Sequence, residues 1–445
     1  MSIKVIKSTM VFPDEKTPRQ SLWLSRLDMM QRPPESHTRV LFIYHSNNDV
    51  TNSTTFFDIE IMKGALSKAL VPYYPLAGRL RINENSNRIE IDCNDEGVLF
   101  IEAETAFSLD DLGDGSNPNY NLRKDLIPTC DCSKGISSFP LLMIQITRFK
   151  CGGVTFGLAS NHHVSDGFAD MLFVDAWASL ARGVEPSIVP CHDRAKFFGP
   201  RDPPLVNFKH LEYEPPLPPL PPKSVTGETS ATREQHFKLS EDQISALKLK
   251  AVSDESVGYK VSTFKAIAAH VWRSVCKARG LADDQDVKLY INTDGRFRLK
   301  DPSFPQGYFG NAIFFSCVVA KAGDIAREPL FYTVDKIDEA VKKMDNPEYL
   351  RSAVDYLESQ EDVKPLIRGP HWATCPNFEI NSWAKFRVPE VDFGWGGPKS
   401  NGHGEVKNEG QAKIFGSLDG DKSTYVGIRL FSSHMDLFTK YFYDF

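Results

Sequence analysis

A proline-rich stretch near the middle of the chain divides it into two segments of similar length. Residues 202–223 read DPPLVNFKHLEYEPPLPPLPPK. Proline fixes its own backbone angle φ and has no N–H to donate, so this stretch is expected to form an extended, semi-rigid connector. The chain has 445 residues, which is more than one hydrophobic core normally organises. We therefore predict an N-terminal domain over 1–200, a linker over 201–230 and a C-terminal domain over 231–445.

The same stretch contains the PxxP pattern that SH3-type domains bind. An interaction protein that presents this motif is therefore an alternative. We favour the linker, because the stretch lies where a domain boundary is expected.

Charge and composition disfavour several classes of function. The chain carries 52 Lys and Arg against 58 Asp and Glu, a formal net charge of -6, with no run of basic residues, so nucleic acid is not expected as a partner. Its most apolar runs, FPLLMIQI and NAIFFSCVVA, are far shorter than the ~20 residues of a membrane-spanning helix. The first residues lack the apolar region of a secretory signal. We expect a cytoplasmic protein that does not bind a membrane.

The cysteines predict free thiols in a reducing compartment. There are eight of them, and only Cys130 and Cys132 lie close together in the sequence. Because no second pair at zinc-binding spacing accompanies them, no metal site is expected.

Local patterns predict a mixed α/β architecture. Ser240 and Gln243 form a capping-box pattern at a helix start, Gly280 marks a helix end, and His270 is expected to be a packed histidine. The apolar spacing of Ile61, Ala65 and Leu66 indicates a helix that ends before Pro72. Strands are predicted over 40–46, 88–94, 140–150 and 153–160, and further helices over 168–181, 239–251 and 263–279.

The sequence NHHVSDGF at residues 161–168 lies between an apolar strand and a predicted helix, a position from which loops present catalytic groups. His162 and Asp166 are four residues apart, and a neutral histidine is the natural general base near pH 7. Asp166 would either orient the histidine or brace the turn through a salt bridge. Gly167 is expected to permit a tight turn.

The chain lacks the other common catalytic motifs. It has no G-x-S-x-G elbow, no P-loop, no glycine-rich dinucleotide fingerprint and no H-E-x-x-H metal site. A base without a nucleophile suits direct deprotonation of a substrate hydroxyl or amine, which then attacks an activated carbonyl in the same pocket.

A second candidate stretch reads VDFGWGGP at residues 391–398. Its composition is typical of a tight turn with a packed tryptophan, and we interpret it as structural. The residues concerned are Asp392, Phe393, Gly394, Trp395 and Gly396.

Together, HHVSDG and DFGWG resemble the two signatures of the plant BAHD acyltransferases, which use acyl-CoA donors. The stretches STMVFP, ALVPYYPLAGRL, SFPLLMIQITRFKCGG, HVWRSVCKARGL, GYFGN and YLRSAVDYLE resemble the hydroxycinnamoyl-transferring branch of that family, so the resemblance covers nearly the whole chain. It implies two similar-sized α/β domains like those of chloramphenicol acetyltransferase, with the active-site channel between them. It also implies a monomer that needs no cofactor, because acyl-CoA is a co-substrate.

The resemblance assigns roles to particular residues. His162 corresponds to the family's base, whereas His163 is a bystander, because the aspartate follows the first histidine at the family's spacing. Asp166 then points away from the reacting centre and pairs with an arginine that corresponds to Arg296. The DFGWG segment is structural in the family.

The acceptor is harder to infer. Relatives that acylate shikimate or quinate carry an arginine in a segment S-W-V-R, where this chain has Trp383 and Lys385, so these two are the expected acceptor-binding residues. Val40 and Phe42 are expected to line the acyl pocket. The stretch IPTCDCSKGISSF resembles anthranilate N-hydroxycinnamoyl/benzoyltransferases, which favours an anthranilate-type acidic acceptor. The alternatives are a shikimate/quinate O-hydroxycinnamoyltransferase and a catalytically silent ligand-binding member of the fold.

Overall fold

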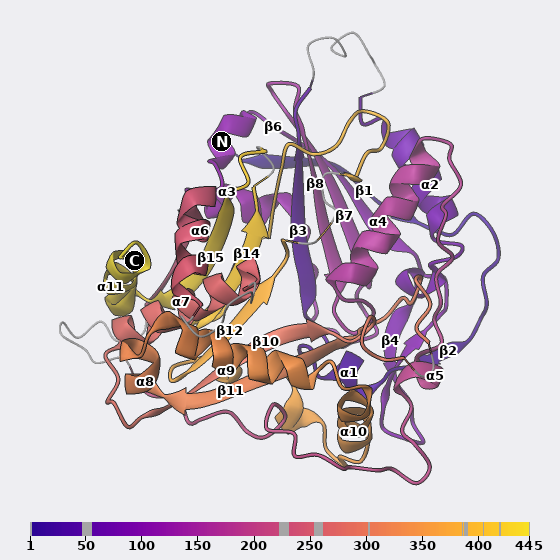
Figure 1. Cartoon of the computed structure of the whole chain (residues 1–445). Helices are drawn as coiled ribbons and strands as arrows, with labels where there is room; N and C mark the ends of the chain where they lie inside the picture. Colours follow the sequence, from indigo (N-terminus) through magenta and orange to yellow (C-terminus); the bar gives the residue numbers. More distant parts are fainter. Residues whose placement is uncertain are drawn as a thin grey trace.

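The chain folds around two six-stranded sheets, one built mostly from each half (Figure 1). The computed structural model describes residues 2–46, 56–221, 231–252, 261–300, 303–384, 386, 390–403, 405–417 and 420–444. No helix of this described part is long and apolar enough to cross a bilayer. All eight cysteines are free, as predicted.

The first sheet has the strand order β1-β6-β7-β8-β3-β13, in which β6 and β7 are parallel and the other neighbours antiparallel. The apolar strands β7 and β8 pair as the predicted hairpin, with Leu142 opposite Ser160. The strands are β1 (Ile3–Val11), β3 (His37–Tyr44), β6 (Val98–Thr105), β7 (Leu142–Phe149), β8 (Val154–Asn161) and β13 (Ser400–His403).

Helices α2 (Ile59–Ala69) and α4 (Gly167–Ala181) pack on one face of this sheet. The indole of Trp177 on α4 donates a hydrogen bond to the carbonyl of Met62 on α2 at 2.9 Å. The buried face of α2 consists of Met62, Ala65, Leu66 and Ala69. Ile61, which the sequence placed on that face, is 40% exposed, because it lies one position, or about 100° around the helix, away from Met62.

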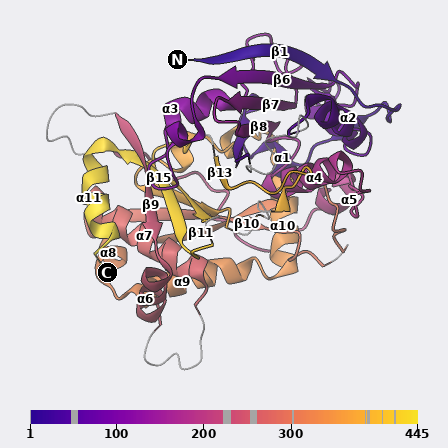
Figure 2. The same cartoon turned by 90° about the horizontal axis from the view of Figure 1, so that it is seen from above.

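The second sheet has the order β11-β10-β12-β14-β15-β9. Its strands are β9 (Thr232–Leu239), β10 (Asp286–Asp294), β11 (Ile313–Lys321), β12 (Asn377–Ser382), β14 (Gln411–Gly416) and β15 (Thr424–Phe431). Its core is shared with α6 (Glu241–Lys250), α7 (Thr263–Arg279), α9 (Leu330–Lys343) and α11 (Ser432–Phe442). Figure 2 shows these helices on the side of the molecule opposite β1, β6 and β7.

The predicted helix signals of this half are confirmed. Ser240 and Gln243 form the capping box of α6. Gly280 ends α7 in the left-handed conformation, with φ of 55°. His270 is buried, and its Nε2 lies 2.8 Å from the carbonyl oxygen of Phe442.

The remaining elements are a three-stranded sheet of order β2-β5-β4 and several short helices. They are β2 (Ser21–Trp23), β4 (Arg79–Ile82), β5 (Ile89–Asp92), α1 (Arg26–Met29), α3 (Tyr120–Arg123), α5 (Arg194–Phe198), α8 (Ala322–Arg327) and α10 (Pro347–Glu358).

Residues 391–403 lie within the second half of the sequence but pack with the first sheet. Strand β13 pairs with β3, with Ser400 opposite Ile43, and Phe393 belongs to the core beneath α2 and α4. The DFGWG segment, expected as part of a domain over 231–445, is therefore part of the first domain's core, because a long-range strand pairing returns the chain there.

The described part of the linker is bound to the second half of the chain. The backbone N–H of Leu217 donates to Asn377 Oδ1 at 3.0 Å, and that of Leu220 donates to the carbonyl of Cys375 at 2.7 Å. The described proline-rich residues up to 221 are thus held against the second half of the chain at these two points.

Candidate active site

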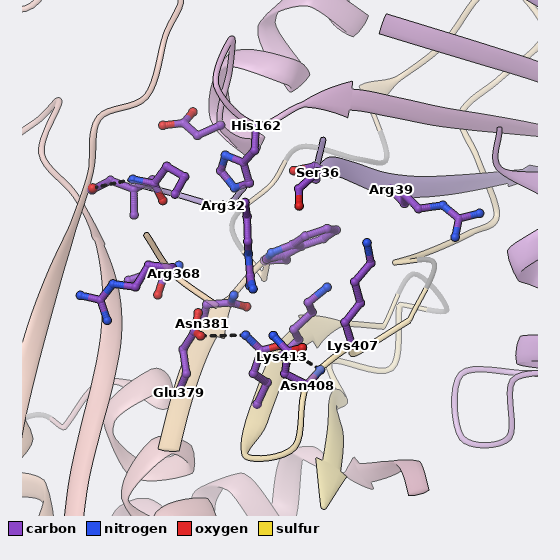
Figure 3. A pocket seen from close by; sticks show the side chains of 18 of the residues that line it. Arg32, Ser36, Arg39, His162, Arg368, Glu379, Asn381, Lys407, Asn408 and Lys413 are labelled. Carbon is purple, nitrogen blue, oxygen red and sulfur yellow. Dashed lines mark hydrogen bonds between the residues drawn. The ribbon is translucent and has the colours of Figure 1, made fainter. Parts of the chain in front are cut away.

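A cavity of about 370 Å³ lies between the two domains and contains His162. Figure 3 shows His162 entering the cavity from one side and Glu379, Asn381, Lys407, Asn408 and Lys413 from the opposite side. Its walls come from residues 31–39 and the end of β8 in the first half, and from β10, β12 and β14 in the second. A substrate that reaches His162 is therefore enclosed by both domains.

The imidazole of His162 is oriented by Asn311. Nδ1 of His162 lies 3.1 Å from Asn311 Oδ1. The amide nitrogen of Asn311 donates to Asp28 Oδ1 at 3.0 Å and to the carbonyl of His162 at 2.8 Å. This network assigns the amide oxygen as the acceptor of a proton on Nδ1. Nε2 of His162 therefore carries the lone pair that a general base needs.

The environment keeps His162 uncharged at neutral pH. Burial lowers the pKa of this imidazole below its ordinary value, and the nearby charge of Arg32 lowers it further, against the opposing effects of Asp166 and Asn311. A neutral imidazole accepts a proton, whereas an imidazolium does not. His162 is thus available as a base near pH 7.

Asp166 braces the loop and does not contact the imidazole through a hydrogen bond. Both nitrogens at the end of the Arg296 guanidinium donate to its two oxygens at 2.9 Å. The same oxygens accept from the N–H of Ala169, where Asp166 caps α4, at 3.1 Å and from the N–H of Ala312 at 2.9 Å. Four donors therefore occupy this carboxylate, which favours the salt-bridge brace over a proton relay.

The Arg296 side chain is itself locked between the two domains. It is 4% exposed and follows β10 in the second half, whereas Asp166 follows β8 in the first. Its guanidinium lies over the rings of Phe168 and Tyr308, at 4.8 and 5.6 Å from their centroids, and donates to the carbonyl of Gly310 at 2.6 Å. The pair therefore joins the domains directly behind the catalytic loop.

His163 lies away from the cavity. It is 1% exposed, and burial together with the neighbouring His162 lowers its pKa to about 3. This histidine is a packed, neutral side chain.

Gly167 serves a different purpose from the expected tight turn. It is the first residue of α4 and does not have a positive φ. A Cβ at this position would lie 2.7 Å from the ring of Phe386. The glycine therefore permits the close approach of Phe386, which lines the same cavity.

The two residues expected in the acyl pocket are core residues instead. Val40 and Phe42 are 9% and 0% exposed and pack with the helices over the first sheet. The ring of Phe42 stacks on Phe156 at 5.0 Å. The cavity is lined instead by Thr38 and Arg39, which lie nearer the start of β3 and are only partly buried.

Of the two expected acceptor-binding residues, Trp383 lines the cavity just beyond the end of β12. Lys385 lies outside the described residues.

The DFGWG segment forms a tight turn away from the cavity. Asp392 Oδ1 accepts from the N–H groups of Gly394 and Gly396 at 2.7 and 2.8 Å. Both glycines have positive φ, 107° and 91°, a conformation that other residues rarely adopt.

The aromatic residues of this segment are packing residues. Phe393 is 1% exposed, with its ring 4.8 Å from that of Trp177 on α4. Trp395 packs on Phe57 at 5.1 Å. These contacts hold the returning chain against the first domain.

Sequence reasoning missed Asn311 and Asp28. Asn311 belongs to GYFGN, a stretch noted for its resemblance to the family, but nothing in the local pattern connects it to His162, which is 149 positions away. The cations that line the cavity were also missed, since each lies in a different segment.

Replacing Asn311 by alanine should lower kcat by roughly 10- to 100-fold, a part of the roughly 10²–10⁴ that a positioned base supplies. The hydrogen bond from Nδ1 to Asn311 raises the pKa of His162, so its loss should move the acid limb of the kcat/KM profile to lower pH. Asn292→Ala, another asparagine of the cavity wall, should leave that limb in place. An unshifted acid limb in Asn311→Ala would contradict this positioning role.

The mixed α/β architecture, with a cavity between its two halves, is the two-domain fold of the chloramphenicol acetyltransferase type. A model of the Transferase family matches residues 1–445. The chain is 46% identical over 451 residues to anthranilate N-benzoyltransferase protein 2 of Dianthus caryophyllus and 47% identical over 453 residues to shikimate O-hydroxycinnamoyltransferase of Nicotiana tabacum, with 100% of both chains covered in each case. The structure of vinorine synthase superposes with a TM-score of 0.75 over 98% of this chain and 96% of that one, at 20% identity.

The chain therefore belongs to the Transferase family, the BAHD acyltransferases. It is an acyltransferase, and CoA thioesters are the co-substrates of this family.

Proposed function

We propose that this acyltransferase moves a hydroxycinnamoyl or benzoyl group from CoA to an acidic amine or hydroxyl acceptor, with an anthranilate-type acceptor favoured. The observation that carries the proposal is the contact of His162 with Asn311 beside the cavity, from which the tautomer of the imidazole is assigned. Its Nδ1 is bound to Asn311, so the basic Nε2 is left for a substrate in the cavity.

In the proposed reaction, Nε2 of His162 removes a proton from the acceptor's N–H or O–H as that atom attacks the thioester carbonyl. The tetrahedral intermediate then collapses, the carbon–sulfur bond breaks, and the imidazolium returns the proton to the leaving thiolate. The products are an amide or ester and free CoA. No covalent acyl-enzyme forms, since the acceptor is itself the nucleophile.

The choice of acceptor is supported by charge and by the relatives. Arg32, Lys407 and Lys413 line the cavity and favour an anion over an ammonium ion. The names of the two relatives specify anthranilate and shikimate, and both of these molecules are carboxylic acids. A shikimate/quinate O-acyltransferase is the second candidate on the same grounds.

The test is a transfer assay with p-coumaroyl-CoA and benzoyl-CoA against anthranilate, shikimate, quinate, tyramine and putrescine. We expect anthranilate to give the highest kcat/KM, and tyramine and putrescine to be at least about tenfold poorer, because a cation loses a charge-assisted contact and is repelled. Preference for an amine without a carboxylate would refute the acceptor assignment. Absence of transfer to every acceptor would favour the catalytically silent, ligand-binding alternative.

A further inference from the structure

Three positively charged side chains from separate segments meet in the cavity. Arg32 lies between α1 and β3, Lys407 lies between β13 and β14, and Lys413 lies on β14. Figure 3 shows Lys407 and Lys413 on the wall opposite His162, with Arg32 reaching into the space between them. The other two cations of the wall are held by backbone carbonyls: Arg39 donates to those of Lys124 and Ile127, and Arg368 to that of Glu212.

The carboxylates of the same cavity are committed to other partners. Glu379 accepts from Gln411 Nε2 at 2.7 Å. Asp294 pairs with Arg296 at 3.4 Å, and Asp166 pairs with the same guanidinium at 2.9 Å. Glu405 lies 3.7 Å from a nitrogen of Arg429.

The three cations therefore have no direct ion-pair partner among the described residues, although Glu405 offsets part of the charge of Lys407, and Glu234 and Glu379 part of that of Lys413. Across the described ranges, Arg32, Lys407 and Lys413 make no ion pair within 4.0 Å and no side-chain hydrogen bond. Concentrating like charges in a poorly hydrated space costs free energy unless a ligand supplies the opposite charge.

The neighbouring charges change the pKa of Lys413. Burial lowers the pKa of its ammonium group to about 8; Glu234 on β9 and Glu379 on β12 oppose this effect, and Arg32 and Lys407 add to it. A bound anion would offset the mutual repulsion and favour the protonated lysine.

An aromatic surface lies beside the same ammonium group. Lys413 Nζ is 4.9 Å from the centroid of the Trp383 ring, and that ring packs against Phe386 at 5.7 Å. A ligand with a flat ring and a carboxylate fits this pairing of an ammonium group with aromatic side chains. Its ring can pack on the aromatic carbons while its carboxylate contacts the ammonium group.

We infer that Arg32, Lys407 and Lys413 form an anion subsite that binds the carboxylate of the acceptor, with Lys413 as its main contact and Trp383 as its aromatic wall. This inference rests on the proposed function and deepens it. The acceptor then spans the cavity, with its carboxylate at Lys413 and its nucleophilic amine or hydroxyl toward Nε2 of His162. The subsite selects acids over neutral molecules of the same shape.

The test compares anthranilate with anthranilamide, which keeps the ring and the amine but replaces the carboxylate by a neutral amide. Lys413→Met should raise the KM of anthranilate about tenfold or more and leave that of anthranilamide within about twofold, because one charge-assisted hydrogen bond is lost. Lys413→Arg should restore most of the selectivity. The matched control is Lys399→Met, which removes an exposed lysine outside this cavity and should change neither KM.

A pH series provides a second readout. In the wild type, the KM of anthranilate should rise as the pH increases above about 8, since Lys413 then loses its proton. In Lys413→Arg this rise should disappear, because a guanidinium stays charged. An equally steep rise in both proteins would contradict the subsite.

Two further results would overturn the inference. If Lys413→Met raised the KM of the acyl-CoA donor instead, the cations would serve the phosphates of CoA. If both acceptors lost affinity equally, the lysine would be structural.

A binding experiment distinguishes failure of the subsite from failure of the proposed function. Benzoate serves as an unreactive ligand, and its binding is measured by tryptophan fluorescence. Binding of benzoate that depends on Lys413, in a protein that transfers no acyl group, would support the subsite and refute the proposed reaction. Acyl transfer that prefers anthranilamide in the wild type would support the transfer chemistry but refute both the subsite and the acidic acceptor.

Discussion

Replacing His162 by alanine should lower kcat/KM for acyl transfer by about 10²–10⁴-fold, the usual contribution of a positioned general base. The reason is that Nε2 of this residue carries the free lone pair in the cavity, while Nδ1 is bound to Asn311. The loss is measured as the initial rate of CoA release with an accepted pair of substrates. Thermal stability should fall less than in His163→Ala, since His162 lines the cavity whereas His163 is packed outside it.

The control is the neighbouring histidine. His163→Ala removes a fully buried ring outside the cavity, so it should lower stability and leave turnover per folded molecule nearly intact. Equal losses of turnover at both positions would contradict the assignment of His162 as the base. Mass spectrometry of the wild type with donor alone should detect no acyl adduct; a stable adduct would exclude direct transfer.

Breaking the pair of Asp166 and Arg296 should destabilise the protein by about 3–5 kcal/mol, because either substitution leaves a buried charge without its partner. Arg296→Ala removes the cationic partner of the buried Asp166, and Asp166→Asn leaves a guanidinium that is 4% exposed with only the more distant, partly exposed carboxylate of Asp294. Both variants should also lose activity, since the pair holds the loop of His162 against the second domain. The free energy of unfolding in urea and the turnover of the folded fraction measure the two effects.

Asp294→Asn is the matched control, because Asp294 contacts the same guanidinium at 3.4 Å but its side chain is 26% exposed. Asp294→Asn should lower the free energy of unfolding much less than Asp166→Asn. If Asp166→Asn retained full stability and lost only turnover, the aspartate would act on the histidine and the bracing role would be wrong.

The elements that sequence reasoning predicted well are those decided by neighbours along the chain. The hairpin of β7 and β8, the capping box at Ser240, and the end of α7 at Gly280 all follow from short patterns. The position of His162 between a strand and a helix is of the same kind. These signals lie within a few residues of the structure they specify, so no tertiary contact is needed to read them.

Burial was predicted less well, because it depends on which element covers a face. Val40 and Phe42 have the apolar character expected of an acyl pocket, but α2 and α4 cover them and make them core. Ile61 matched a helical spacing and still lies outside the buried face of α2. Gly167 is required by the ring of Phe386, which approaches from the other half of the chain.

The sequence by itself determined the α/β class, and local composition and spacing also predicted a two-domain division and His162 as the candidate base. The return of residues 391–403 to the first sheet moves part of the predicted C-terminal domain into the first. Only the tertiary structure decided the partners of that histidine and the charge of its cavity. Asn311 lies 149 positions from His162, and Arg32 and Lys413 come from opposite ends of the chain to one cavity. Such contacts depend on strand order and domain packing, which bring distant segments together without leaving a pattern in either segment.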